Sequence, residues 1–214
     1  MKKPIAVLFD MDGLMVDSEL TRAESFKNVI RNHGVVVKEK IPHVIGVRVL
    51  DNWVIMKDKY GLKEDPAKLM EEGEEEYTKL IEKKMPITMP GLFQLIDYIK
   101  KVNIKRAVVS SAGIRHIKIK LEKLKLTDFF ETMVSGDMLT KGKPDPEGYL
   151  LAAKKLGVDA TDCLVLEDAP SGVQAAKAAG MLCVAIPSTY TKNGDFSQAD
   201  LILKDLREVI AILK

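Results

Sequence analysis

Short apolar runs recur along the chain, and each stops abruptly at a polar residue. The first covers residues 5–9 and ends at Asp10, with Gly13 close behind it. A run of this length that is rich in branched residues and followed by a turn former is typical of a buried strand leading into a loop. The same pattern predicts strands at residues 107–109, 164–166 and 182–186, and more weakly at 132–134 and 201–203.

Segments with helical periodicity lie between these runs. They cover residues 91–102, 113–125, 146–157, 170–179 and 205–213. Alternation of strand and helix is typical of βαβ units, in which helices cover both faces of a parallel sheet. We therefore predict an α/β fold with a doubly wound, Rossmann-like parallel sheet as its core.

The stretch from residue 19 to residue 84 breaks this alternation. It carries helical pattern interrupted by glycines and prolines, and it contains no convincing strand pattern. A structureless connection of this length is rare in compact domains. We predict a small α-helical cap domain at residues 18–86, inserted into a core domain that comprises residues 1–17 and 87–214.

Charge and composition exclude some classes of protein. The 214 residues include 33 Lys and Arg against 31 Asp and Glu, which gives a net charge of +2. So balanced a charge gives no reason to expect a nucleic-acid partner, because a protein that binds nucleic acid usually shows an excess or a stripe of basic residues. The acidic cluster at residues 71–76 and the lysine-rich stretch at residues 118–125 follow helical patterns, so we expect both to be solvated faces.

The apolar runs and the two cysteines bear on membrane association and on the redox compartment. No apolar run approaches the roughly 18 residues that a membrane span needs, so no membrane partner is expected. Cys163 and Cys183 each lie within an apolar run. Two buried thiols without a disulfide or zinc pattern suit a reducing compartment. We expect a cytoplasmic protein and, by default, a monomer.

Polar side chains that can carry chemistry follow the predicted strands. Ligands of an open parallel sheet bind outside the carboxyl ends of its strands, so these residues are the most informative. One aspartate at such a place is explained by a strand that reaches solvent. A whole set is not explained in this way, because carboxylates, hydroxyls and a lysine converge on one edge of the predicted sheet. The set comprises Asp10, Asp12, Ser110, Ser111, Lys143, Glu167 and Asp168.

This set suits the transfer of a phosphoryl group. A carboxylate such as Asp10 can attack phosphorus and form an acyl phosphate, which splits one difficult step into two. A magnesium ion and a lysine beside Asp10 would keep it ionised. Asp12 lies farther from the positive charge and could alternate between its protonated and ionised forms as the general acid and base.

The remaining polar residues suit metal and phosphate binding. Asp168, and Glu167 through a water molecule, would complete the oxygen-ligand shell that Mg²⁺ prefers. Ser110 and Lys143 supply a hydroxyl donor and a positive charge for phosphoryl oxygens. Ser111 either assists Ser110 or points away from the site.

Four motifs together resemble those of the haloacid dehalogenase superfamily. Residues 10–18, Asp-Met-Asp-Gly-Leu-Met-Val-Asp-Ser, resemble the first motif and Ser110 the second. Lys143 in Gly-Lys-Pro-Asp-Pro resembles the third motif, and Glu167–Gly172 the fourth. The resemblance covers essentially the whole chain and is greatest to the β-phosphoglucomutase-like branch. It implies that the first aspartate is nucleophile and metal ligand, and that the second binds the metal through its backbone carbonyl while its side chain transfers protons.

The second aspartate of the first motif narrows the chemistry. The dehalogenases of the superfamily lack it, because displacement of a halide needs no protonation of a leaving group. The phosphonate-cleaving relatives also lack it and use a cap lysine. By this resemblance Asp12 favours phosphoryl transfer, and the expected substrate is a small phosphate monoester, with sugar phosphates first.

Hydrolysis and a mutase reaction both pass through a phosphorylated Asp10. The mutase members carry a histidine shortly after the first motif and a lysine in the cap. The corresponding positions here hold Arg22 and either Gly73 or Glu74. Both departures favour a phosphatase, with a phosphohexomutase of the β-phosphoglucomutase type as the alternative.

Substrate contacts from the cap are less well defined. Residues 44–49 resemble the cap segment of the 2-deoxyglucose-6-phosphate phosphatase-like branch, which makes Arg48, Gly46 and Arg22 candidate contacts. A lone arginine on a helical segment more often faces solvent.

Two rival classes use the same kind of fold. A phosphoacceptor signalling domain takes its phosphate on a mid-chain strand and has no helical insertion after its first strand. A non-catalytic binding protein would be expected to have lost one of the chemical residues, all of which are present.

Overall fold

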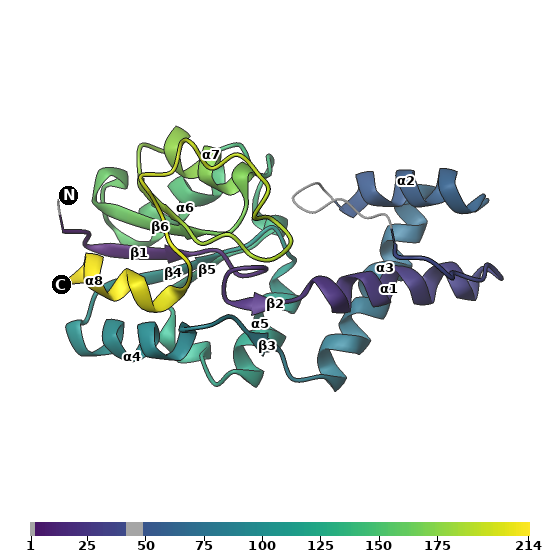
Figure 1. Ribbon diagram of the computed structural model, residues 1–214, viewed down its shortest axis with the longest axis horizontal. Helices are drawn as coiled ribbons and strands as arrows, with labels where there is room; N and C mark the ends of the chain where they lie inside the picture. Colours follow the sequence, from purple (N-terminus) through teal and green to yellow (C-terminus); the bar gives the residue numbers. More distant parts are fainter. Residues whose placement is uncertain (1–2, 42–48) are drawn as a thin grey trace. The chain divides into compact units, whose positions relative to one another are not determined.

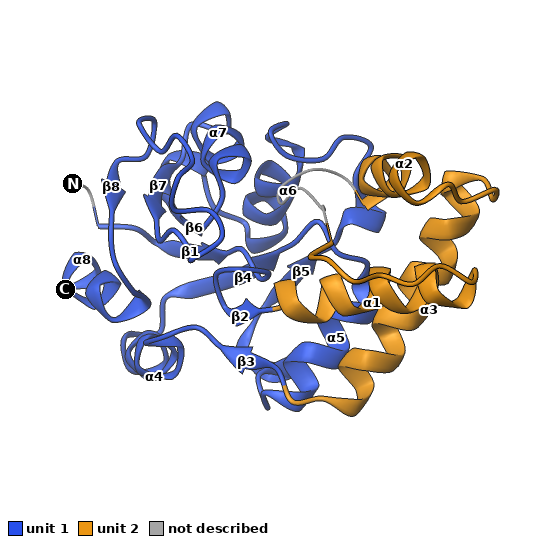
Figure 2. Cartoon of the chain, turned by 45° about the vertical axis from the view of Figure 1, so that its right-hand side comes forward, with its two compact units in different colours: residues 1–17, 86–214 blue, residues 18–85 orange. Residues whose placement is uncertain are grey.

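The computed structural model describes residues 3–41 and 49–214. The chain divides into two compact units, shown in different colours in Figure 2. Unit 1 comprises Met1–Asp17 and Pro86–Lys214, and unit 2 comprises Ser18–Met85. Candidate residues Gly46 and Arg48 lie outside the described residues.

A six-stranded sheet forms the centre of unit 1 (Figure 1). Its strand order is β5-β4-β1-β6-β7-β8, and every neighbouring pair is parallel. The order places β1 between β4 and β6, with Phe9 aligned to Val108 on one side and to Leu166 on the other. The predicted α/β class and parallel sheet are confirmed. The strands are β1 (Ala6–Phe9), β4 (Lys105–Val109), β5 (Thr132–Val134), β6 (Cys163–Glu167), β7 (Leu182–Ala185) and β8 (Leu201–Ile202).

Helices cover both faces of this sheet, and side-chain alternation along β1 explains why. Val7 and Phe9 point into one apolar core, while Ala6 and Leu8 point into the other. A strand buried on both faces must be apolar at every position, as β1 is. The first core is covered by α4 (Leu92–Val102), α5 (Ile114–Lys123) and α8 (Val209–Leu213), and the second by α6 (Glu147–Leu156) and α7 (Pro170–Ala178).

The ends of several elements differ from their predicted positions. Strand β4 begins two residues early, at Lys105, because polar side chains at its start find backbone partners. The Nζ of Lys105 donates to the carbonyl of Leu156, and Arg106 donates to the carbonyls of Ile104 and Phe129. The predicted helix at 205–213 begins as a 3₁₀ turn. The described 3₁₀ helices are η1 (Thr127–Phe129), η2 (Gly136–Met138), η3 (Ala160–Asp162) and η4 (Leu206–Glu208).

A second, two-stranded sheet lies where the chain leaves and re-enters unit 1. Strand β2 (Val16–Asp17) pairs antiparallel with β3 (Ile87–Thr88). The sequence pattern does not predict this ladder, because two residues per strand are too few to show alternation.

Unit 2 is built from three described helices: α1 (Glu19–Asn32), α2 (Val49–Tyr60) and α3 (Pro66–Lys83). They enclose an apolar core of their own, in which Phe26 packs edge-on against the buried ring of Trp53 with 4.9 Å between ring centroids. Gly73 on α3 allows this packing, because a Cβ there would meet the indole ring at 2.8 Å. Along its described residues, unit 2 contains no strand.

The acidic cluster of α3 is not simply a solvated face, and that prediction was wrong for three of its members. Glu72 pairs with His33 at 2.7 Å, Glu74 with Arg22 at 2.6 Å, and the carboxylate of Glu76 accepts a hydrogen bond from Asn28. All three partners belong to α1 or follow it directly. Helix α1 packs against α3, and these three carboxylates, which span about one turn of α3, find their partners on it or directly after it.

Two further predictions concern apolar segments. Cys163 and Cys183 are buried free thiols on β6 and β7. Across residues 3–41 and 49–214, no helix has both the length and the apolar character that a bilayer span requires.

Candidate active site

Three neighbouring strands end at the same edge of the sheet and bring Asp10, Ser110 and Asp168 together. Each of these residues directly follows the last residue of its strand. The backbone continues the ladder at this edge, since the N–H of Asp10 donates to the carbonyl of Leu166 and that of Ser110 donates to the carbonyl of Val134. The side chains are thereby held at fixed points on the carboxyl edge, where ligands of such sheets bind.

Asp10 is the centre of a buried charge network. Its side chain is 9% exposed, and its Oδ1 lies 2.5 Å from the Nζ of Lys143. The same ammonium lies 2.5 Å from Oε1 of Glu167. One lysine thus bridges two carboxylates, and it is supplied by the loop before α6. Glu147 steadies this loop, because its carboxylate accepts hydrogen bonds from the backbone N–H groups of Thr140 and Lys141.

Burial and neighbouring charges together determine the pKa values of Asp10 and Lys143. Desolvation raises the pKa of Asp10 to about 7; Lys143 opposes the rise, while Glu167 and Asp12 add to it. Desolvation lowers the pKa of Lys143, but the two carboxylates outweigh it and raise that pKa above its usual range. The lysine is therefore a permanent cation, and Asp10 needs further positive charge to be fully ionised at neutral pH.

Glu167 is almost fully enclosed, with 1% of its side chain exposed. Its Oε1 accepts a hydrogen bond from the hydroxyl of Tyr149 at 2.7 Å, and its Oε2 accepts from the backbone N–H groups of Asp168 and Ala169. Gly172 makes room for it, since a Cβ there would lie 1.7 Å from a carboxylate oxygen. Both oxygens of Glu167 are thus already engaged, and its role as a metal ligand through water stays a prediction.

Asp168 lies opposite the turn that follows β1. Gly13 adopts a φ of +93°, and a Cβ at this position would meet Oδ2 of Asp168 at 2.2 Å, so a glycine is required on both counts. The hydroxyl of Thr191 donates to the same oxygen at 3.4 Å. Burial, followed by the neighbouring charges of Asp10 and Glu167, raises the pKa of Asp168 well above its usual range.

This crowding of acids fits a divalent cation. Asp10, Glu167 and Asp168 each offer a carboxylate oxygen within 4.8 Å of the other two. Three buried acids with one lysine between them leave an excess of negative charge, and all the donors are oxygens. Hard cations such as Mg²⁺ prefer such donors, whereas softer metals prefer nitrogen and sulfur.

Asp12 has a separate partner that the sequence pattern did not identify, so the expectation that it lies farther from positive charge than Asp10 was wrong. Its Oδ1 forms a hydrogen-bonded ion pair with Lys120 of α5, and Ser110 Oγ donates to its Oδ2 at 3.4 Å. The expectation that residues 118–125 form a solvated face was therefore wrong for Lys120, which is 2% exposed. A signal existed, because Lys120 falls on the same helical face as the apolar residues Ile117 and Leu121.

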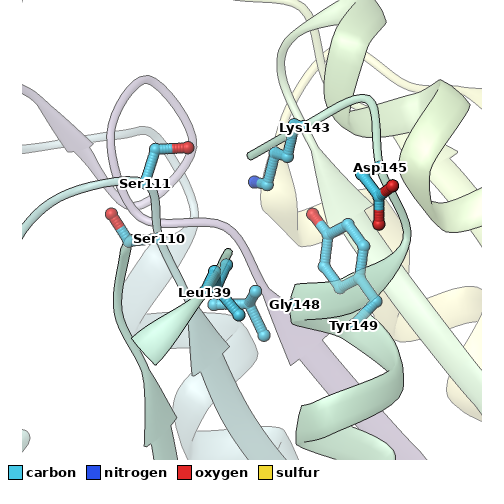
Figure 3. Close-up of a pocket in the computed structure, with 8 residues that line it drawn as sticks. Ser110, Ser111, Leu139, Lys143, Asp145, Gly148 and Tyr149 are labelled. Carbon is cyan, nitrogen blue, oxygen red and sulfur yellow. The ribbon is translucent and has the colours of Figure 1, made fainter. Parts of the chain in front are cut away.

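A small pocket opens beside this network (Figure 3). Ser110 and Ser111 lie on one side of it, and Lys143, Asp145 and Tyr149 lie on the other. Hydroxyl groups and an ammonium facing a shared space suit the binding of a phosphoryl group. Sequence reasoning did not assign Asp145 or Tyr149 to the site, and Tyr149 was missed because an aromatic residue early in a helix is typical of core packing.

The candidate contact Arg22 is engaged within unit 2. Its guanidinium lies 2.6 Å from the Glu74 carboxylate and 3.6 Å from the centre of the Tyr77 ring. Arg22, at the position where the mutases carry a histidine, is thus ion-paired to Glu74, which with Gly73 is one of the two candidates for the position of the mutase cap lysine.

A doubly wound sheet that gathers two aspartates, a lysine and an acidic cluster at its carboxyl edge suits an enzyme that acts on a phosphoryl group. Over residues 7–186 the chain matches the model of the haloacid dehalogenase-like hydrolase family, and it belongs to this family. The predicted superfamily is confirmed.

Relatives of known name agree with this assignment. The chain is 33% identical over 183 residues to a phosphorylated carbohydrates phosphatase of Thermotoga maritima, with 82% of each chain covered. It is 30% identical over 213 residues to hexitol phosphatase B of Escherichia coli, with 97% of this chain and 95% of the relative covered. The crystal structure of a CbbY mutant from Rhodobacter sphaeroides in complex with xylulose-1,5-bisphosphate has a TM-score of 0.86 at 23% identity, with 99% of both chains covered, which is a likeness of fold.

Proposed function

We propose that this protein is a Mg²⁺-dependent phosphatase that hydrolyses small phosphate monoesters through an aspartyl phosphate on Asp10. The observation that carries the proposal is the buried network at the sheet edge, in which a carboxylate, a permanent ammonium and two further acids adjoin a pocket with hydroxyl walls. A phosphoryl-transfer site needs a nucleophile, charge compensation and a proton donor, and the network supplies each one.

In the first step a carboxylate oxygen of Asp10 attacks phosphorus, and the bond from phosphorus to the ester oxygen breaks. Lys143 and Ser110 hold the phosphoryl oxygens, and Asp12 gives its proton to the departing alkoxide. In the second step the ionised Asp12 takes a proton from water, whose oxygen attacks the phosphorus of the aspartyl phosphate. Inorganic phosphate and the free carboxylate of Asp10 result.

The acidic cluster is the proposed metal site. Asp10, Asp168 and the backbone carbonyl of Asp12 would hold Mg²⁺, which supplies charge that keeps the nucleophile ionised and offsets the phosphoryl charge. The fully engaged Glu167 would then act mainly by fixing Lys143.

The names of two relatives support phosphorylated carbohydrates as the substrate class. The residues at the two mutase positions favour hydrolysis over the mutase alternative, because Arg22 stands in place of the histidine, and Gly73 or Glu74 in place of the lysine, that a mutase carries. Unit 2 is proposed to act as the cap that selects the substrate and excludes bulk water. A cytoplasmic location, a monomeric state and the roles of Gly46 and Arg48 stay predictions.

Phosphate release from a panel of phosphorylated carbohydrates, with Mg²⁺ and with EDTA, tests the proposal. We expect metal-dependent release from one or a few esters, none from the Asp10→Asn variant, and a decrease in kcat of about 100-fold or more for Asp12→Asn. The panel includes β-glucose 1-phosphate assayed for isomerisation. Isomerisation without net phosphate release would instead establish the mutase, and full activity of Asp10→Asn would disprove the mechanism.

A further inference from the structure

Lys120 combines two properties that rarely occur together, deep burial and a positive charge. It lies on α5 between core residues, and its side chain is 3% exposed. Among the described residues, it is the lysine with the most completely buried side chain. Lysine is almost never fully buried unless it is paired, because removing an ammonium from water is costly. Its ion pair with Asp12 accounts for the burial of the ammonium, which leaves the effect of the pair on Asp12 to be explained.

The contact divides the two oxygens of Asp12 between different surroundings. Oδ1 is held by the Lys120 ammonium from the buried side. Oδ2 lies next to the hydroxyl of Ser110, which lines the pocket and is itself fixed by a hydrogen bond from the N–H of Ala112 at 3.1 Å. The Asp12 side chain remains 28% exposed, so the carboxylate is anchored on one side and open on the other.

The two aspartates of the motif are thus served by different lysines. Lys143 reaches Asp10 from the loop before α6, and Lys120 reaches Asp12 from α5. Lys143 adjoins the pocket and can touch a bound phosphoryl group, whereas Lys120 is not among the pocket residues. The contact that links Lys120 to the proposed chemistry is its ion pair with Asp12.

We propose that Lys120 is a positioning residue, which anchors Oδ1 of Asp12 so that Oδ2 faces the leaving oxygen and carries the transferred proton. This inference rests on the proposed function. Oδ2 gives its proton to the ester oxygen as the bond to phosphorus breaks, and it takes one from water in the next step. Lys120 keeps its own protons throughout. Without the anchor, the carboxyl group rotates among several orientations, and fewer of them can transfer a proton.

Two aryl phosphates of nearly the same shape provide the test. Phenyl phosphate releases a basic phenolate that needs protonation, whereas p-nitrophenyl phosphate releases an anion that is stable without it. The measured quantity is kcat/KM with saturating Mg²⁺, because it covers the steps up to the loss of the leaving group. A general acid contributes about 100-fold or more to such a step, so its misplacement is measurable.

We expect Lys120→Met to lower kcat/KM at least about tenfold for phenyl phosphate and less than about threefold for p-nitrophenyl phosphate. Lys120→Arg should recover most of the lost activity, since it restores a cationic donor. The matched control is Lys118→Met, which removes the same charge from an exposed position of the same helix and should change neither value. In an Asp12→Asn background, Lys120→Met should add no further discrimination between the two esters.

An equal loss on both esters, no loss on either, or added discrimination between the esters in the Asp12→Asn background would overturn the inference and leave Lys120 a structural residue. If Lys120→Met does not fold, Lys120→Gln provides the same comparison with a neutral side chain of similar length. Failure of the wild-type enzyme to hydrolyse any ester would contradict the proposed function instead. The two failures are therefore distinguishable.

Discussion

The carboxyl of Asp10 lies in a buried cluster that holds two further acids and one lysine. Without a metal, this cluster contains more negative charge than Lys143 can offset, and burial raises the pKa of Asp10 to about 7. The pKa of Asp168 is raised by the same causes. The residues that suit catalysis thus make the metal-free protein less stable at neutral pH.

The stability of the metal-free protein should decrease as the pH rises from 5 to 8. The folded-state pKa of Asp10 lies above its ordinary value of 3.8. The folded state therefore binds more protons than the unfolded state between these values, and its stability is lost as the pH rises through about 7. Between pH 5 and pH 8, the free energy of unfolding should fall by less in Asp10→Asn than in the wild type. The difference should exceed about 1 kcal/mol, since a tenfold change in a dissociation constant corresponds to about 1.4 kcal/mol.

Urea unfolding in EDTA at pH 5 and at pH 8 measures this difference. Addition of Mg²⁺ at pH 8 should restore stability to the wild type and restore less to Asp10→Asn. An identical pH dependence of the two proteins would show that Asp10 is not the group that titrates.

Residues whose position follows from the end of a strand could be predicted from the sequence, as Asp10, Ser110 and Asp168 illustrate. Lys120 could not be assigned in this way, because it meets Asp12 across 108 residues of chain and its burial depends on that partner. Tyr149 likewise reads as apolar packing until Glu167 is placed beside its hydroxyl.

Helix α5 follows Ser110 and Ser111, the serines proposed to bind phosphate, and carries Lys120, the lysine that contacts Asp12, so the start of this helix is important for the proposed site. Its N-cap residue, Gly113, has no side chain to cap the first turn. The carboxylate of Asp137 in η2 replaces it and accepts a hydrogen bond from the N–H of Ile114 at 2.6 Å. A carboxylate at this end also interacts favourably with the helix dipole.

Asp137→Ala should destabilise the protein by about 1 kcal/mol, the usual effect of losing a helix cap. Asp137→Asn keeps an acceptor oxygen and should lose less. Urea unfolding of the three proteins at one pH provides the comparison. Equal stability of Asp137→Ala and the wild type would mean that water replaces the carboxylate without cost.

At the scale of elements, strong periodicity identified helices α4 to α7 and the strands of the six-stranded sheet, and their ends differ from the predicted ones by at most two residues. Boundaries are less certain because side chains at the ends decide them, as Lys105 does at the start of β4. The pair β2 and β3 was missed, because two-residue strands are fixed by the meeting of distant segments. The pairings of α3 with α1 also depend on tertiary contact and have no local signal.

At the scale of the whole molecule, the chemistry and the helical insertion belong to different units. All the described residues of the acidic network and of the pocket belong to unit 1, whereas unit 2 has a separate core around Trp53. If unit 2 selects the substrate, as proposed, this division would let specificity vary in one unit while the proposed phosphoryl-transfer residues stay fixed in the other.

Trapping of the phosphorylated enzyme tests the central claim most directly. The wild-type protein is quenched during turnover of p-nitrophenyl phosphate with Mg²⁺, treated with borohydride and digested for mass spectrometry. An aspartyl phosphate is reduced by this treatment, so we expect homoserine in place of Asp10 in the wild type and none in EDTA or in Asp10→Asn. Turnover with an unmodified Asp10, or reduction at Asp12 or Asp168 instead, would contradict the assignment of Asp10 as the nucleophile.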